Sequence, residues 1–196
     1  MVYKHFYSGK EIKFMEELVK LARETVKEYL KTKKVKMKEL EKFKEKRGVF
    51  VSIHTYPEKE LRGCIGFPYP EHPIYKAVQL AAIEAAFKDL RFSPLAEDEL
   101  NQVVFEVSIL TEPKEVSQEK IKEKDGVIIE NGLNKGLFLP QVWEQLPDKK
   151  LFLYNLCWKA GLPETCLQDK KTKFYRFSVE AFEEVEPEGK IKRIRM

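Results

Sequence analysis

The chain has 196 residues, of which 43% are hydrophobic and 35% are charged, and its 36 basic and 32 acidic side chains leave a formal charge of +4. A chain of this size buries roughly 70% of its unfolded surface, so it needs neither disulfides nor a metal to hold a core. The longest run without a charged residue, 48–57, is far shorter than the about 20 apolar residues of a membrane helix, and the first residues contain no apolar signal-peptide core. These features exclude a membrane protein, a secreted disulfide scaffold and a disordered chain, and they favour a cytoplasmic protein.

The charged residues are rich in Lys and Glu, a composition typical of hyperthermophile proteins. The one basic cluster, 190–195, follows a Pro-Glu-Gly break in the sequence. It is either a solvated tail or a contact for an anion, and the small net charge argues against nucleic-acid binding.

The three cysteines, Cys64, Cys157 and Cys166, do not have the spacing of a zinc site, and no histidine motif accompanies them. The chain also lacks a Gly-rich phosphate loop, so we predict neither a metal nor a cofactor. Reduced thiols are expected without a signal peptide. A disulfide between Cys157 and Cys166 stays open if the source is a hyperthermophile.

Hydrophobic spacing and turn residues predict a series of helices and strands. In chain order they are helix 8–31 with a capping box at Ser8, a charged connector 32–47 with a short helix at 37–43, strands 48–54 and 61–67, helix 73–89, strands 101–110, 126–129 and 136–139, helix 151–160 and strand 174–182. In the helix over 151–160, the side chains predicted to be buried are Leu151, Phe152, Leu156 and Trp158.

Two parts of the chain share the order strand–strand–helix–strand. Residues 48–51 match 126–129, and residues 62–68 match 135–140 when one residue is skipped. A repeated unit rich in hairpins predicts an α+β protein with a largely antiparallel, curved sheet. We predict a single domain over 1–196 and leave two lobes as an alternative, with a helix and connector (1–47), two repeats (48–115 and 116–186) and a basic tail (187–196).

A difference between the two repeats suggests where a site lies. Alternate residues share a face of a strand, so Arg62, Cys64 and Gly66 share one, where the second repeat has a lysine and two leucines. Replacing two leucines by a cysteine and a glycine leaves a space that either another element or a ligand must fill. Gly63 and Gly66 also permit a close approach of backbone or ligand.

Cys64 is the candidate nucleophile. Arg62 would lower the pKa of its thiol if the two side chains approach, and His54 on the neighbouring strand is the candidate base. A tight loop at 57–60 would place His54 and Cys64 on opposite faces of the hairpin, and a slip of one residue would reverse this. The alternative is that Cys64 is a small buried hydrophobic residue.

Three further charged residues are candidates for a site near Cys64. Asp89 and Arg91 lie at a helix end, where they either pair with each other on the surface or face the space beside Cys64. Glu106 alternates with apolar residues in a predicted strand. It faces either solvent or Arg62, for which it would be a natural partner.

Five motifs resemble the AMMECR family, which is named after a human chromosomal region linked to Alport syndrome, midface hypoplasia and elliptocytosis. They are 61–66 (LRGCIG), 85–95 (AAFKDLRFSPL), 106–110 (EVSIL), 136–142 (GLFLPQV) and 156–163 (LCWKAGLP). The resemblance implies two similar repeats around one mostly antiparallel, barrel-like sheet with helices outside, and a cleft near the first motif. It implies no established activity, but relatives look linked by gene neighbourhood or fusion to a radical S-adenosylmethionine protein and a Memo-like protein.

The first hypothesis is therefore a binding module for a small molecule or a partner protein in a modification pathway. The residues expected to form its cleft are Arg62, Gly63, Cys64, Gly66, Asp89, Arg91 and Glu106. An enzyme with Cys64 as nucleophile and His54 or Glu106 handling protons is the first alternative. Weak nucleic-acid binding through the basic tail is the second.

Overall fold

The structure of the protein is a computed structural model that describes residues 9–194, with side chains from residue 13 onward. The predicted capping box at Ser8 lies outside the described residues. The chain divides into two compact units, which we call unit 1 (9–109 and 181–194) and unit 2 (110–180).

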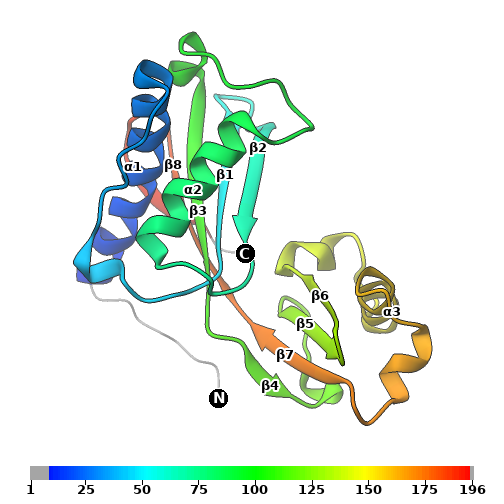
Figure 1. Ribbon diagram of the computed structural model, residues 1–196. Coiled ribbons are helices and arrows are strands. Elements are labelled where there is room, and N and C mark those ends of the chain that lie inside the picture. Colours follow the sequence, from blue (N-terminus) through cyan, green and yellow to red (C-terminus); the bar gives the residue numbers. More distant parts are fainter. Residues whose placement is uncertain (1–8, 195–196) are drawn as a thin grey trace. The chain divides into compact units, whose positions relative to one another are not determined.

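Unit 1 contains two long helices and a five-stranded sheet (Figure 1). Its elements are α1 (Gly9–Thr32), η1 (Glu41–Phe43), β1 (Val49–Thr55), β2 (Leu61–Phe67), α2 (Ile74–Phe87), η2 (Asp98–Gln102), β3 (Val103–Leu110), β8 (Val179–Glu184) and β9 (Ile191–Ile194). The strand order is β2-β1-β3-β8-β9. β1 is antiparallel to both β2 and β3, and β8 is antiparallel to β9.

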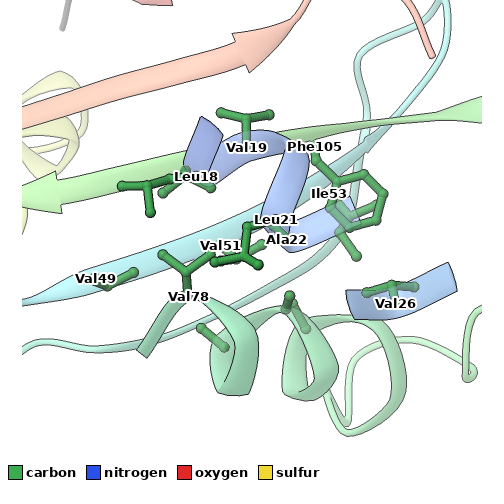
Figure 2. Close-up of a cluster of buried hydrophobic side chains, with 14 of the residues drawn as sticks. Leu18, Val19, Leu21, Ala22, Val26, Val49, Val51, Ile53, Val78 and Phe105 are labelled. Carbon is green, nitrogen blue, oxygen red and sulfur yellow. The ribbon is translucent and has the colours of Figure 1, made fainter. Parts of the chain in front are cut away.

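The core of unit 1 lies between the sheet and the two helices, as Figure 2 shows. Val49, Val51 and Ile53 of β1 are fully buried in this core, together with residues of α1 and α2. Successive side chains of a strand point to opposite faces, so Ser52 and His54 lie on the other side of the sheet. We call that side the polar side and define it by Ser52, His54, Cys64, Glu106 and Glu183.

A buried ion pair fastens α1 to the sheet of unit 1. Arg23 and Glu184 are only 4% and 2% exposed, and the guanidinium donates two hydrogen bonds of 2.7 and 2.5 Å to the carboxylate. Arg23 also donates to the carbonyl oxygens of Leu100 and Val103, and Glu184 accepts from the backbone nitrogen of Phe105. Charges removed from water need such partners, so removing either one would leave the other buried and uncompensated.

Unit 2 contains a four-stranded sheet in the order β4-β7-β5-β6. Its elements are β4 (Lys114–Val116), η3 (Gln118–Lys120), β5 (Gly126–Asn131), β6 (Asn134–Phe138), η4 (Pro140–Glu144), α3 (Lys149–Lys159), η5 (Glu164–Gln168) and β7 (Lys173–Phe177). In its core the ring of Trp143 stacks on Phe152 with centroids 3.9 Å apart. A disulfide between Cys157 and Cys166 joins α3 to η5.

The burial predicted for the α3 side chains was half right. Phe152 and Leu156 are fully buried, but 54% of Leu151 and 79% of Trp158 are exposed. Residues seven apart lie on one face of a helix, and Leu151 and Trp158 share the face directed away from the core. An apolar run alone does not show which face of a short helix is covered.

The α+β class is confirmed, but the described residues form two antiparallel sheets rather than one, and no closed barrel. The strand predicted over 174–182 is two strands in different sheets. Ser178 lies between them, and there its backbone nitrogen donates to Thr111 Oγ1 and its carbonyl accepts from the Thr111 backbone nitrogen. Most of β8 and all of β9 belong to unit 1, and part of the predicted basic tail is a strand rather than free chain.

Both sheets share one local topology. The first strand of each hairpin lies between its hairpin partner and the strand that follows the helix, as β2-β1-β3 in unit 1 and β6-β5-β7 in unit 2. This arrangement allows the two hairpins to be compared residue by residue.

Candidate functional site

The two glycines of the LRGCIG motif in β2 are explained by packing. A Cβ at Gly63 would lie 2.2 Å from the carbonyl oxygen of Ala85 in α2, a distance that would force the helix away. A Cβ at Gly66 would lie 2.4 Å from the ring of Phe50, which fills the space beside it. Helix backbone and an aromatic ring thus occupy the space next to these glycines.

Asp89 and Arg91 hold the backbone of Cys64. The carboxylate of Asp89, 4% exposed, accepts hydrogen bonds from the Cys64 backbone nitrogen at 2.9 Å and from Arg91 Nε and Nη2 at 2.9 and 2.7 Å. Arg91 Nη2 also donates to the Cys64 carbonyl oxygen at 3.2 Å. The hydrogen bonds from Arg91 hold the pKa of Asp89 well below its usual range. β2 is an edge strand, so this pair occupies backbone groups that could otherwise pair with another strand.

Arg62 binds to the segment that follows α2. Its Nε and Nη2 donate to the two carboxylate oxygens of Glu99 at 2.8 and 3.0 Å, and Nη1 donates to the Ser93 carbonyl oxygen at 2.9 Å. This two-point contact is the strongest arginine–carboxylate geometry, and it lowers the pKa of Glu99. Glu106, considered from the sequence as a partner of Arg62, instead accepts a hydrogen bond from Ser108.

Three of the predicted binding residues therefore connect β2 to the segment after α2. Arg62 and Asp89 are largely enclosed by their partners, with 13% and 4% of their side chains exposed. Arg91 keeps 57% of its side chain exposed. Of these three residues, Arg91 is the best placed to contact another molecule as well.

The side chain of Cys64 lies on the polar side of the sheet. Cys64 is opposite Ser52 on β1, and Ser52 Oγ donates to Cys64 Sγ at 3.2 Å. Burial raises the pKa of the Cys64 thiol, the hydrogen bond from Ser52 opposes this effect, and the charge of Glu106 adds to it. The thiol is therefore protonated at neutral pH, which makes it a weak nucleophile in the free protein.

An irregularity in the β1–β2 hairpin places His54 on the same side as Cys64. The register pairs Ser52 with Cys64 and His54 with Leu61, so that Arg62 is an extra residue on β2. The tight-loop register considered from the sequence would have placed His54 and Cys64 on opposite faces. One extra residue reverses this relation, because the side-chain period of a strand is two.

Three side chains from adjacent strands meet on the polar side. They are His54 of β1, Glu106 of β3 and Glu183 of β8, and one nitrogen or oxygen atom of each lies within 4.8 Å of the others. The Nδ1 atom of His54 is buried and has no hydrogen-bond partner in the described part of the chain. Lys59 and Lys192 lie 3.3 and 3.0 Å from the Glu183 carboxylate.

Burial controls the charge of this cluster. It lowers the pKa of His54, so the imidazole is neutral at pH 7, and it raises the pKa of Glu106 against the effect of the Ser108 hydrogen bond. Burial would also raise the pKa of Glu183, but Lys192 and Lys59 together lower it below its usual value. Glu183 thus remains charged, whereas Glu106 takes up a proton more readily.

Sequence reasoning did not identify Ser52, Lys59 or Glu183 as site residues. Ser52 had a local signal, because polar side chains at 52 and 54 alternate with buried ones along β1. No local signal in the sequence marked Glu183, since its approach to His54 depends on how β1, β3 and β8, which are far apart in the chain, pair in the sheet. Lys59 lies in the turn between β1 and β2 and reaches the site through Glu183.

A family model described as AMMECR1 matches residues 19–182 of the chain. The chain belongs to the AMMECR1 family. Protein MJ0810 of Methanocaldococcus jannaschii is 45% identical over 183 residues, which cover 88% of this chain and 91% of that protein. Protein PF1979 of Pyrococcus furiosus is 45% identical over 196 residues and covers 91% of each chain. The crystal structure of uncharacterized protein PH0010 from Pyrococcus horikoshii has a TM-score of 0.79 at 43% identity, covering 94% of this chain and 98% of that one.

Membership of the AMMECR1 family confirms the resemblance drawn from the five motifs. In this AMMECR1 protein the first two motifs lie together, since Gly63 contacts Ala85, and Asp89 and Arg91 bind Cys64. Among the described residues, no helix is both long enough and apolar enough to cross a membrane.

Proposed function

We propose that this AMMECR1-family protein is a binding module whose ligand contacts the polar side of the unit 1 sheet. The observation that supports it most directly is the grouping of half-buried polar side chains from three neighbouring strands, Ser52 and His54 with Cys64 and Glu106. Polar groups removed from water cost free energy unless they are paired, and His54 Nδ1 is not paired within the described residues. A ligand with polar groups would supply the missing partners.

The residues expected from the sequence divide into two roles in this proposal. Cys64, Glu106 and the exposed guanidinium of Arg91 contact the ligand. Arg62 and Asp89 keep β2 in place through their ion pairs, and Gly63 and Gly66 do so by allowing close packing. Arginine suits this position because its fork can hold Asp89 and still present a charge to an anionic group.

Backbone amide NMR of the full chain tests this proposal, with a panel of carboxylic acids, amino acids and nucleotides as probes. We expect shift changes centred on Ser52, Cys64 and Glu106. Ser52→Leu places a bulky apolar side chain on the polar side and should weaken binding by about 10-fold or more, since it removes a polar group and one hydrogen bond. Ser117→Leu, at an exposed position in unit 2, is the matched control. Shift changes confined to other surfaces, or none with any probe, would contradict the proposal.

The family resemblance also suggests protein partners, namely a radical S-adenosylmethionine protein and a Memo-like protein of the same organism. Size-exclusion chromatography of the purified proteins tests this directly. We expect co-elution with at least one of them and loss of co-elution for Ser52→Leu but not Ser117→Leu. Separate elution in every mixture would remove the partner part of the proposal.

An enzyme with Cys64 as nucleophile is the second candidate, because His54 and Cys64 share the polar side. Cys64 is the only cysteine outside the disulfide, so alkylation of the oxidised protein reports on this thiol alone. Since burial raises the pKa of the thiol, we expect slow labelling with a midpoint above the free-thiol value of about 8.5. Rapid labelling with a midpoint below that value would favour the enzyme instead.

A further inference from the structure

We infer that His54, Glu106 and Glu183 form a binding site for one divalent transition-metal ion, of which zinc is the representative. The inference deepens the proposed function and rests on it for the role of the ion, because Glu106 belongs to the same polar side. Its physical basis is separate and lies in the geometry of the three side chains.

The positions of the three side chains suit a metal site. β1, β3 and β8 are neighbouring strands inside the sheet, and strands hold ligand atoms more precisely than loops. The candidate ligand atoms lie within 4.8 Å of one another. Zinc bonds of about 2.0–2.2 Å place neighbouring ligand atoms roughly 3.3 Å apart, so a closure of about 1.5 Å at most is needed. Rotation of the two glutamate side chains supplies a movement of that size.

The two carboxylate ligands are each oriented by a neighbour, as metal-binding side chains usually are. Ser108 Oγ donates to Glu106 Oε1 at 2.9 Å, and Lys192 Nζ lies 3.0 Å from Glu183 Oε1. Such outer contacts fix the direction of a carboxylate and leave its other oxygen for the ion. His54 Nδ1 is buried and unpartnered within the described residues, so no hydrogen bond competes with an ion for that nitrogen.

The charge of the cluster matches a divalent ion. Its two carboxylates supply the negative charge that a divalent ion needs, and imidazole binds metals in its neutral form. In the structure, the ammonium of Lys59 supplies a positive charge beside Glu183. Its Nζ lies 3.3 Å from Glu183 Oε2 and 3.2 Å from the Glu184 carbonyl oxygen. Its side chain is 35% exposed and extends from a turn, so the ammonium can move into water when an ion binds. Lys192 keeps its contact with the other oxygen of Glu183.

The ligand set selects the class of metal. One imidazole nitrogen with two carboxylate oxygens suits zinc, manganese or iron, whereas magnesium and calcium prefer oxygen ligands alone. Three protein ligands leave at least one coordination position open, as in catalytic rather than structural zinc sites. That position would be available to a polar group of the ligand bound on the same side of the sheet.

The test is zinc binding by the full-length protein after chelator treatment, measured by competition with a chromophoric indicator and by native mass spectrometry. We expect one zinc ion per chain. His54→Ala and Glu183→Gln should each weaken binding by about 100-fold, because each removes one of only three ligands. His72→Ala, whose ring contacts Phe67, and the exposed Glu112→Gln should bind zinc as the wild type does. No zinc at one equivalent, or equal binding by His54→Ala, would overturn the inference.

Two further variants separate the site from its alternatives. Lys59→Met removes the competing ammonium and should tighten zinc binding by about 10-fold, an effect that damage to the fold would not produce. Weaker binding by Lys59→Met, or loss of zinc in Cys64→Ala with retention in His54→Ala, would overturn the inference. If zinc does not bind but the NMR probes still do, the metal site fails alone. If neither binds, the proposed function fails with it.

Discussion

The β1–β2 hairpin of unit 1 and the β5–β6 hairpin of unit 2 each contain a glycine that brings a strand against a helix. Gly63 contacts Ala85 of α2, and Gly136 contacts Ala160 at the end of α3. In both hairpins the next residue points to the other side of the sheet. In unit 1 this next residue is Cys64, which lies opposite Ser52 on β1. Both side chains of this pair are polar and half-buried.

The corresponding pair in unit 2 is Leu137 with Ile128, and both of these side chains are apolar and buried. The same backbone arrangement therefore forms with either kind of pair. Because the fold does not require polar groups at these positions, their presence in unit 1 needs another reason, and binding is the reason we propose. The polar side of unit 1 thus differs from its counterpart in unit 2 at positions where the packing does not demand polar groups.

The interiors of the two units differ as well. Unit 1 contains the buried Arg23–Glu184 pair, and unit 2 contains the Cys157–Cys166 disulfide. Both tryptophans, Trp143 and Trp158, are in unit 2, so tryptophan fluorescence reports on unit 2. Far-UV circular dichroism is dominated by α1 and α2 and reports mainly on unit 1. The two signals make the comparison measurable by denaturant unfolding.

The largest effect is expected for Glu184→Ala. The change leaves the Arg23 guanidinium buried without its carboxylate, which costs about 3–5 kcal/mol of unfolding free energy. The dichroism transition should move to much lower urea, and the fluorescence transition should move little. Glu188→Ala, which breaks an exposed pair with Lys27, is the control and should cost less than about 1 kcal/mol. Equal losses in both variants would contradict this account.

Next in size is the difference between the two hairpin glycines. Gly63→Ala forces a Cβ to within 2.2 Å of a helix carbonyl, whereas a Cβ at Gly136 would lie 2.9 Å from the Ala160 side chain. We expect losses of about 3 kcal/mol for Gly63→Ala and about 1 kcal/mol for Gly136→Ala. The first should appear in the dichroism and the second in the fluorescence. A larger loss for Gly136→Ala than for Gly63→Ala would contradict this account, because it would mean that α2 moves away from the added Cβ more easily than α3 does.

A smaller effect, and one that depends on pH, is expected for Asp89→Asn. The carboxylate has a depressed pKa in the folded state, so its stabilisation is present above its unfolded pKa of about 3.9 and is lost as pH falls below that value. At pH 7 the substitution should cost about 2 kcal/mol, since it weakens hydrogen bonds to a charged acceptor. Urea unfolding at pH 7, 5 and 3 should show the wild type and the variant converging at low pH. A constant difference would mean that the charge is unimportant.

The smallest effect on stability is expected for Ser52→Ala, which removes a hydrogen bond between half-buried groups. The loss should be less than about 1 kcal/mol. Because the Ser52 hydrogen bond opposes the rise in the thiol pKa, the alkylation midpoint of Cys64 should move further upward. A downward movement would show that Ser52 does not stabilise the thiolate.

Local patterns predicted much of unit 1 correctly, including α2, β1, β2 and β3, because apolar spacing and turn residues mark those elements. The division of 174–182 into two strands was missed. The residue at the break is Ser178, and neither glycine nor proline stands there to mark the end of a strand. The sequence indicated that His54 and Cys64 lie on neighbouring strands, but it could not show that they share a side of the sheet. Their sides depend on the register of the hairpin, in which Arg62 is an extra residue on β2. Glu183 was missed because only tertiary pairing brings it near Glu106.

The buried pair of Arg23 and Glu184 has a consequence for the synthesis of the chain. The two residues are 161 positions apart, and a ribosome adding about 5–20 residues per second needs roughly 8–32 s to pass from one to the other. During that time the nascent Arg23 lacks Glu184, while β4 to β7 are all produced. Unit 2 can therefore complete its sheet before unit 1 receives its last two strands. The part of the protein that is translated first is the part that closes last.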